Sequence, residues 1–373
     1  MTKPLRLAIV GAAGRGGHLA RLCASVGDVE LTTVCDIRAE VLERCRQESG
    51  AREAYTDFAE MLRASDCEAV LIGTPMQLHA EQAMAVLASG RHVLSEVTAA
   101  TSLDECRRLR AAVQASHAVY TMAENYGYSL ECALVNELVR QGAFGEVYYA
   151  EGEYLHELKG LIEETPWRLA WQANVPGISY PTHSLGPVLE WFAGDRVDRL
   201  TATDSGSHYR DPRGAPYHHD SASVLAKTVQ GRQITLRFDM ISNRPHGMNR
   251  FQLQGTEGCY ESGRVDGEPG RLWLSRLHRS CAFQDIGQLL RSREAWERML
   301  PEWYRDGWER ARTSGHGGAD WFMLRRFVET VRGRIPNPCG IDTALDMTLP
   351  GLVSQDPAAY DRWLPVPDSR TWA

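Results

Sequence analysis

The sequence predicts an α/β N-terminal domain, a doubly wound parallel sheet over residues 1–125, followed by an α+β domain over residues 126–373 with a large open, mostly antiparallel sheet. Short apolar runs alternate with amphipathic helical patterns as far as residue 122, which is typical of parallel strands joined by helical crossovers. Beyond residue 126, strand-like runs follow one another without helices between them, as in antiparallel sheets. The 373 residues suffice for about two domains. We expect the C-terminal segment to pack back on the first domain.

The composition favours a cytoplasmic, globular protein. Hydrophobic residues make up 43% and charged residues 24% of the chain, and the net charge of −7 argues against a nucleic-acid partner. No apolar run approaches the ~18 residues of a membrane span, and the first residues lack the apolar core of a signal peptide. The nine cysteines are scattered without a Cys-x-x-Cys pair, so we expect neither disulfides nor a zinc ribbon.

A glycine-rich turn follows the first predicted strand, residues 5–10. Gly11, Gly14 and Gly16 lie between this apolar run and a helical pattern, although Ala13 occupies the middle glycine position of a Gly-x-Gly-x-x-Gly motif. Such a turn lets backbone N–H groups and a helix N-terminus approach a pyrophosphate. Asp36 ends the second predicted strand, where an acidic residue binds the adenosine ribose and repels a 2′-phosphate. The pattern favours NAD over NADP, with a plain strand-turn-helix as the alternative. The predicted loop contacts are Gly11, Ala13, Gly14, Arg15, Gly16, Asp36 and Arg38, of which Arg38 is the residue that does not favour NAD.

The remaining elements of the first domain follow in alternation. We expect helices over residues 38–48, 57–63, 77–89 and 103–114, and strands over 69–72, 91–94 and 119–122. Ligands bind outside the carboxyl ends of such strands. Further cofactor contacts are therefore predicted at Thr74, Pro75, His79, Glu96 and Asn125, with a solvated surface histidine as the alternative for His79.

The second domain begins with a helix over residues 130–141. Strands are expected over residues 145–156, 197–203, 221–228, 233–240, 250–255 and 258–261, helical structure over 289–312, and an amphipathic helix over 320–332. The proline-containing tail from Pro350 is expected to run over the surface.

The sequence resembles the Gfo/Idh/MocA oxidoreductase family over essentially its whole length. The glycine loop with Asp36, Gly73-Thr-Pro-x-x-x-His79 and Gly90-Arg-His-Val-Leu-Ser-Glu96 carry the resemblance, which implies a Rossmann domain. The family's Glu-Lys-Pro reads Glu96-Val97-Thr98 here, so the lysine that assists hydroxyl deprotonation is missing. Its Asp-x-x-x-His reads Ser179-x-x-x-His183.

These two departures indicate a branch that resembles the NAD-dependent glycoside hydrolases of family 109, known for α-N-acetylgalactosaminidase activity. Tyr180-Pro-Thr-His-Ser-Leu-Gly-Pro187 is the most specific stretch. The other matching stretches are Ser95-Glu-Val with Ala99-Ala100, Met122-Ala-Glu-Asn125, Gly152-Glu-Tyr-x-His156, Pro166-Trp-Arg168 and Gly315-His-Gly-Gly-x-Asp320. His246 stands where the family shows a tyrosine, which leaves the sugar's identity open.

The resemblance implies hydrolysis by transient oxidation of the sugar at C3, elimination across C1 and C2, addition of water and re-reduction, with bound NAD recycled. We assign proton transfer to Tyr180 and His183, which lie three apart and would share one face of a first helical turn. Core packing is the alternative for Tyr180 and a structural role for His183. The implied sugar-binding residues are Glu124, Tyr154, His156, Arg168, His246 and His316, and structural roles are nearly as probable for His156 and His316.

No metal site is expected. His208, His218, His219 and Asp220 are close in sequence, but adjacent histidines in a loop are more often solvated. Two rival functions remain: a net NAD-dependent dehydrogenase of a sugar or cyclitol, and a non-catalytic sugar or NAD sensor. An exposed face of the second sheet favours a homodimer or tetramer.

Overall fold

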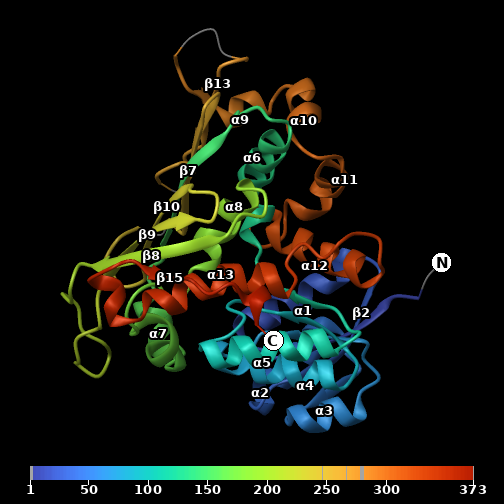
Figure 1. The fold of residues 1–373 in the computed structure, drawn as a ribbon. Helices are drawn as coiled ribbons and strands as arrows, with labels where there is room; N and C mark the ends of the chain where they lie inside the picture. The colour runs from blue at the N-terminus through green and yellow to red at the C-terminus, as the bar shows by residue number, and fades with distance from the viewer. Residues whose placement is uncertain (1–2, 246, 266, 278–280, 373) are drawn as a thin grey trace. The chain divides into compact units, whose positions relative to one another are not determined.

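The computed structural model describes residues 3–245, 247–265, 267–277 and 281–372, and it divides into two compact units (Figure 1). Unit 1 comprises residues 1–125, 309–345 and 369–373, and unit 2 comprises residues 126–308 and 346–368. Within the described residues, no helix is both long and apolar enough to cross a membrane.

Unit 1 is built on a six-stranded parallel sheet in the order β3-β2-β1-β4-β5-β6. The strands are β1 (Leu5–Val10), β2 (Val29–Cys35), β3 (Glu53–Tyr55), β4 (Ala69–Ile72), β5 (His92–Ser95) and β6 (Tyr120–Met122). This is the strand order of a doubly wound dinucleotide-binding sheet, in which the order of the strands reverses between β1 and β4. The carboxyl ends of β1 and β4 are therefore where a ligand site is expected.

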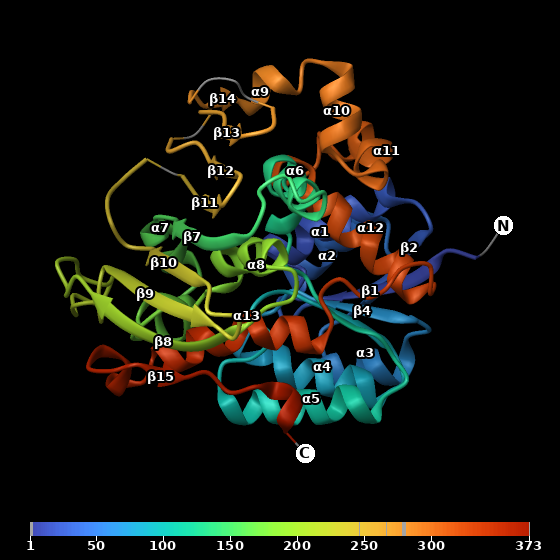
Figure 2. The ribbon, with the colours of Figure 1, turned by 45° about the horizontal axis from the view of Figure 1, so that its top comes forward.

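Helices cover both faces of this sheet. They are α1 (Gly14–Val26), α2 (Ala39–Ser49), α3 (Phe58–Ala64), α4 (His79–Ala88), α5 (Leu103–Ala115) and α12 (Ala319–Val331), with short helices η1 (Met76–Leu78), η4 (His316–Gly318) and η6 (Ser369–Thr371). Figure 2 shows α1 and α12 on one face, where they pack together, and α4 and α5 on the other. Burial on both faces explains why β1 and β4 read as continuous apolar runs.

Unit 2 contains a nine-stranded sheet in the order β14-β13-β12-β11-β7-β10-β9-β8-β15. The strands are β7 (Val147–Leu155), β8 (Val197–Asp204), β9 (Ser221–Thr228), β10 (Gln233–Asp239), β11 (Asn249–Gly255), β12 (Gly258–Glu261), β13 (Arg271–Leu274), β14 (Gln284–Asp285) and β15 (Leu364–Pro365). All the pairings are antiparallel except that between β7 and β10. The predicted fold class is thus confirmed in both halves of the chain.

Helices α6 (Leu130–Arg140) and α8 (Thr182–Trp191) lie together and α8 packs on β7, β10 and β11 (Figure 1). Strand β9 alternates strictly between partly exposed and buried residues, as expected where only one face of a sheet is covered by protein. The other helices that begin or end in unit 2 are η2 (Tyr126–Tyr128), α7 (Lys159–Glu164), π-helical η3 (Leu169–Ala173), α9 (Ile286–Leu289), α10 (Arg293–Met299), α11 (Glu302–Ala311), α13 (Ile341–Ser354) and η5 (Pro357–Tyr360).

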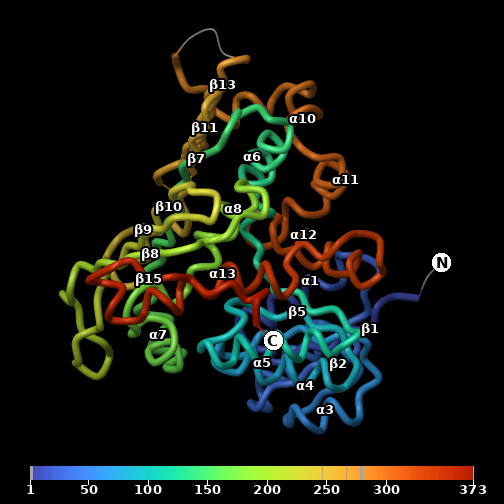
Figure 3. Tube along the Cα trace, in the orientation of Figure 1, coloured from blue at the N-terminus to red at the C-terminus, as the bar shows by residue number. Residues whose placement is uncertain are grey.

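Two expectations for the C-terminal half are made more precise by the structure. The helical stretch predicted over residues 289–312 is three short helices, α9 to α11, because Ser292 caps α10 and Pro301 precedes α11. The tail does not run over the surface from Pro350 as expected, because Pro350 is buried inside α13. Beyond α13 the chain adds β15 to the edge of the sheet beside β8, as the red trace in Figure 3 shows.

Candidate functional site

The glycine loop of unit 1 joins β1 to α1 by a very close turn. Gly11 has a φ of +84°, and a Cβ there would lie 2.6 Å from the carbonyl carbon and oxygen of Gly73. A Cβ on Gly16 would lie 1.9 Å from the Gly11 carbonyl oxygen. Gly14 adopts a φ of +48° with open space around its Cβ position, whereas Ala13 is in an ordinary extended conformation. The displaced glycine therefore supplies a second residue of positive φ after Gly11, and Ala13 in the usual middle position brings no backbone strain.

These features form a cradle that fits a dinucleotide. The backbone is bare of side chains at the start of α1, as a pyrophosphate bound at a helix N-terminus requires. Asp36, directly after β2, is 7% exposed, and its Oδ1 accepts hydrogen bonds from the backbone N–H of Arg38 at 2.9 Å and from its Nε at 3.4 Å. Arg38 is thus paired with Asp36, the residue predicted to bind the adenosine ribose. This pairing accounts for the presence of an arginine beside a carboxylate that favours NAD.

The loops after β4 and β5 are held by buried polar contacts. His79 is 2% exposed; its Nδ1 lies 2.9 Å from the Thr98 carbonyl oxygen and its Nε2 lies 2.8 Å from that of Thr74. Burial lowers the pKa of His79 despite these two carbonyls. The alternative of a solvated histidine is therefore wrong, and His79 braces two loops at the carboxyl edge of the sheet. Thr74 donates its hydroxyl to Gln82 at 2.6 Å, and Pro75 leads into η1.

A buried ion-pair cluster lies beside the glycine loop. The Arg15 guanidinium donates to Glu96 at 2.9 Å and to both oxygens of Asp320 at 2.6 and 2.7 Å. Asn125 and His316 also contact Asp320. Sequence reasoning included Asp320 only as the end of a family motif and assigned it no role; its signal was the spacing of four residues from His316.

Unit 2 brings the predicted proton-transfer residues together. Tyr180 precedes α8, which begins at Thr182, so the two residues do not share a helical turn as expected from their spacing. Their rings nevertheless lie 5.0 Å apart between centroids, at nearly right angles. Tyr154 on β7 lies 5.6 Å from Tyr180 and 5.5 Å from His183, and Tyr126 lies 4.3 Å from His183.

The other predicted sugar-binding groups of this unit join the same cluster. The Tyr154 hydroxyl and His156 Nδ1 are 2.8 Å apart. Arg168 is held by Thr165 at 3.0 Å and by Gln172 at 2.6 Å, with its guanidinium 4.5 Å above the Trp167 ring. Burial lowers the pKa of Arg168, which the interactions with Tyr180 and Tyr154 partly offset. The predicted groups of unit 2 thus form one aromatic, titratable cluster.

The remaining predicted residues belong to the other unit or lie outside the described residues. Glu124, which is 6% exposed, and His316 belong to unit 1. His246 lies outside the described residues.

The loop histidines are not the solvated pair that the sequence suggested. His219 is 3% exposed, with Nε2 at 2.9 Å from the Gly177 carbonyl oxygen, whereas His218 is exposed. Over the described ranges, no group of three or more His, Cys, Asp or Glu side chains is arranged to hold a metal ion.

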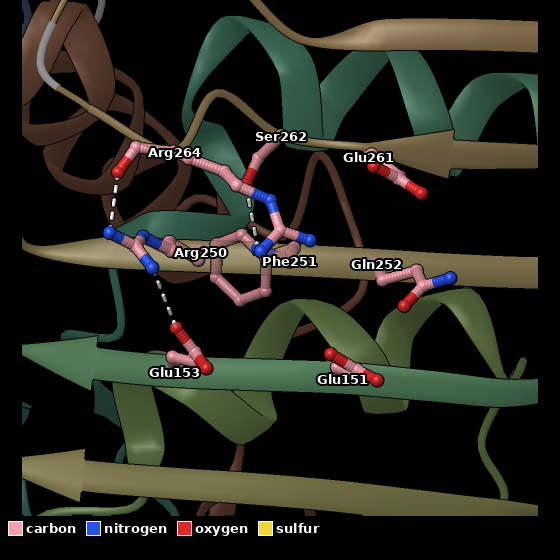
Figure 4. A pocket seen from close by; sticks show the side chains of 8 residues that line it. All are labelled: Glu151, Glu153, Arg250, Phe251, Gln252, Glu261, Ser262 and Arg264. Atoms are coloured by element: carbon pink, nitrogen blue, oxygen red, sulfur yellow. Dashed lines mark hydrogen bonds and ion pairs between the residues drawn. The ribbon is translucent and has the colours of Figure 1, made fainter.

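A polar pocket lies elsewhere on the sheet of unit 2. It is lined by Glu151, Glu153, Arg250, Phe251, Gln252, Glu261, Ser262 and Arg264 (Figure 4). Glu151 and Glu153 flank Gly152, which faces α8, so their side chains project from the opposite face of β7. None of these eight residues belongs to the predicted site.

Comparison with known proteins agrees with the division of the chain. Residues 5–124 match the model of the oxidoreductase family with an NAD-binding Rossmann fold. Residues 128–369 match the model of the glycosyl hydrolase 109 C-terminal domain. The chain belongs to glycosyl hydrolase family 109. Its N-terminal domain places it within the wider Gfo/Idh/MocA oxidoreductase family, as the motifs predicted.

Family 109 relatives cover most of the chain. A glycosyl hydrolase family 109 protein of Shewanella pealeana is 30% identical, over 94% of this chain and 82% of the relative. An α-N-acetylgalactosaminidase of Shewanella oneidensis is 31% identical, over 88% of this chain and 76% of its own. Among solved structures, a levoglucosan dehydrogenase in complex with NADH has a TM-score of 0.79 at 18% identity, covering 98% of this chain and 100% of that one. The similarity to levoglucosan dehydrogenase shows the fold alone.

Proposed function

We propose that this family 109 member is an NAD-dependent glycoside hydrolase that oxidises C3 of its sugar transiently and recycles the cofactor. The observation that carries the proposal is the contact between the Tyr180 and His183 rings, in the part of the chain that matches the family 109 C-terminal domain. The relatives' names support an N-acetylhexosaminide as substrate. The cradle formed by Gly11, Gly14 and Gly16, with Asp36, would hold the NAD.

When bound, NAD supplies the acceptor and donor of the C3 hydride. The chain's own residues supply the proton transfers. A ketone at C3 acidifies the C2 proton, so its removal can expel the group at C1, and water then adds to the resulting double bond. We assign the proton transfers at C2 and at the C3 hydroxyl to His183 and Tyr180, and each can contribute about 10²- to 10⁴-fold.

In unit 1, Val97 occupies the position of the lysine that usually assists hydroxyl deprotonation. Its side chain is apolar and the residue is 3% exposed, so it cannot take that role. The imidazole–phenol pair of unit 2 offers a ring nitrogen that can accept a proton and a hydroxyl that can donate one. Arg168 and Glu124 would orient sugar hydroxyls, and Tyr154, His156 and His316 would bind others.

The test is nitrophenol release from a panel of α- and β-nitrophenyl hexosides and N-acetylhexosaminides, with purified protein and no added cofactor. Release of more than one equivalent per protein would support recycling of bound NAD. No release, together with NADH formation only when NAD⁺ and a free sugar are supplied, would contradict the proposal and establish a net dehydrogenase. Nucleotide binding without either turnover would indicate a sensor.

A further inference from the structure

Helix α8 carries a proline, Pro187, in its interior. In a regular α-helix the His183 carbonyl would accept from the backbone N–H of the residue four positions later, and that residue is Pro187. Proline has no N–H, and its ring crowds the carbonyl four positions before it. His183 is only 9% exposed, so bulk water is a poor substitute for the missing donor. The hydrogen bond that the helix would normally give to this carbonyl must be replaced from elsewhere.

Asn249 supplies a donor to that carbonyl. Its side-chain Nδ2 donates to the His183 carbonyl oxygen at 3.4 Å, across 66 residues of sequence. The distance is at the long end for such a bond, and the burial of the carbonyl is what gives the contact its weight.

The position of Asn249 in the sheet explains why it can reach α8. Asn249 is the first residue of β11 and lies opposite Tyr154 of β7. Residues paired in this way project from the same face of a sheet. The Tyr154 ring lies 5.5 Å from the His183 ring. Two paired strands therefore contact His183 from neighbouring positions, one at its backbone and the other at its ring.

The other end of the same amide indicates that Asn249 is not there for packing alone. Its Oδ1 is buried and has no hydrogen-bond partner among the described residues. A buried unpaired acceptor is costly, and an aliphatic side chain of similar size would avoid that cost. Exchanging the two amide atoms would not help, because Oδ1 would then face the His183 carbonyl oxygen. The donor Nδ2 is therefore the group that this position uses.

We propose that Asn249 is a positioning residue for His183, and that its amide replaces the backbone hydrogen bond that Pro187 removes. The Tyr180 and His183 rings lie 5.0 Å apart, so a shift of the first turn of α8 would change their separation. The consequence for proton transfer rests on the proposed function. The coupling between Asn249 and Pro187 does not.

The test is a double-mutant cycle in the full chain. Asn249→Leu removes the donor, and Pro187→Ala returns a backbone N–H that can serve the same carbonyl. In the otherwise unmodified protein, Asn249→Leu should lower kcat on the best nitrophenyl glycoside by about 10-fold or more, with KM nearly unchanged. In the Pro187→Ala background, most of that loss should disappear.

Thermal unfolding gives a second readout that needs no turnover. The Tm change caused by Asn249→Leu should be more negative, by about 2–4 °C, in the unmodified background than in the Pro187→Ala background. Gln252→Leu is the matched control: its side chain leaves the same strand on the pocket side of the sheet, so its effect should be equal in both backgrounds (Figure 4). If Asn249→Leu does not fold, Asn249→Ala removes the same donor and takes its place in the cycle.

Equal effects of the Asn249 substitution in both backgrounds, on kcat and on Tm, would overturn the proposal. A raised KM with unchanged kcat and no rescue would also overturn it, because Asn249 would then act on the sugar directly. Absence of turnover in the unmodified protein would contradict the proposed hydrolase. The Tm cycle would still decide whether Asn249 serves the carbonyl opposite Pro187.

Discussion

Replacing Gly152 with Ala should disturb the proposed proton-transfer cluster of Tyr154, Tyr180 and His183 through the backbone of α8. Gly152 lies on β7 between the pocket-facing Glu151 and Glu153, and its missing side chain lets α8 approach the sheet. A Cβ there would lie 2.0 Å from the Ser184 carbonyl oxygen and 2.8 Å from its carbonyl carbon, whereas ordinary contact begins at 3.4 Å. The obstacle is backbone rather than a flexible side chain, so the first turn of α8, which carries His183, must move away from Tyr154.

The expected cost has two parts. Overpacking in a close-packed core costs about 1–3 kcal/mol, and each kcal/mol lowers the Tm by roughly 2–4 °C for domains of 150–250 residues. Misplacing a reacting group by ~1 Å can cost about 10²-fold in rate. NAD affinity should change little, since the cofactor residues belong to unit 1.

The assay combines thermal unfolding, NAD binding by fluorescence titration and kcat/KM on the best nitrophenyl glycoside. Gly160→Ala is the matched control: it lies in α7 of the same unit, nothing lies within 4 Å of its Cβ position, and alanine favours a helix by about 1 kcal/mol. A Gly152→Ala protein with the Tm and the turnover of the unmodified chain would refute the argument that this close approach positions His183.

Three further predictions follow from individual side chains. Asp36→Asn should weaken NAD binding by about 10- to 100-fold, because a charge-assisted hydrogen bond is worth ~1.5–3 kcal/mol. It should also reduce the preference of the protein for NAD over NADP. Isothermal titration with both nucleotides measures the two affinities, and an unchanged preference would contradict the assignment of Asp36 to the ribose. Tyr180→Phe and His183→Ala should each lower kcat by at least ~10²-fold while leaving NAD affinity unchanged, which a sensor would not show. Because burial lowers the pKa of His79, its contribution to stability is complete above the unfolded-state value of 6.5 and is lost as the pH falls below that value toward the folded-state pKa. The Tm measured from pH 8 to 5 should therefore fall less steeply in His79→Gln than in the unmodified protein, and equal slopes would contradict this.

Much of unit 1 could be predicted because its signals are local. The strand over Leu5–Val10 is buried almost throughout, so it reads as an apolar run, and the glycines after it mark the turn whatever the rest of the chain does. By contrast, β3 is three residues long and β14 and β15 are two each, which is too short to show a period of two. The parallel pairing of β10 with β7 joins strands about eighty residues apart, which no local pattern encodes.

The candidate site residues also divide into those with a local sequence signal and those without one. The proximity of Tyr180 and His183 was predicted from one contiguous motif, although the structure brings their rings together across a helix start rather than within a turn. The role of Asp320 could not be found this way, because its contact with Arg15 spans 305 residues and depends on α12 packing against α1. His219 was misjudged because the carbonyl of Gly177, which accounts for its burial, lies 42 residues earlier in the chain.

The charge states of the two units explain why the proposed chemistry divides between them. In unit 1, Glu96 and Asp320 both accept hydrogen bonds from Arg15, and donation from His18, His316 and Arg15 holds the pKa of Asp320 well below its ordinary value, so this carboxylate is charged at neutral pH. Val97 places an apolar side chain where the wider family carries a lysine. Fixed charges suit the binding and orientation of a cofactor, whereas elimination needs groups that gain and lose protons near neutral pH. In unit 2, Tyr154 and Tyr180 pack around His183, so phenol and imidazole groups that can exchange protons lie side by side. The proposed function therefore places cofactor binding in the ionic part of the protein and proton transfer in its aromatic part.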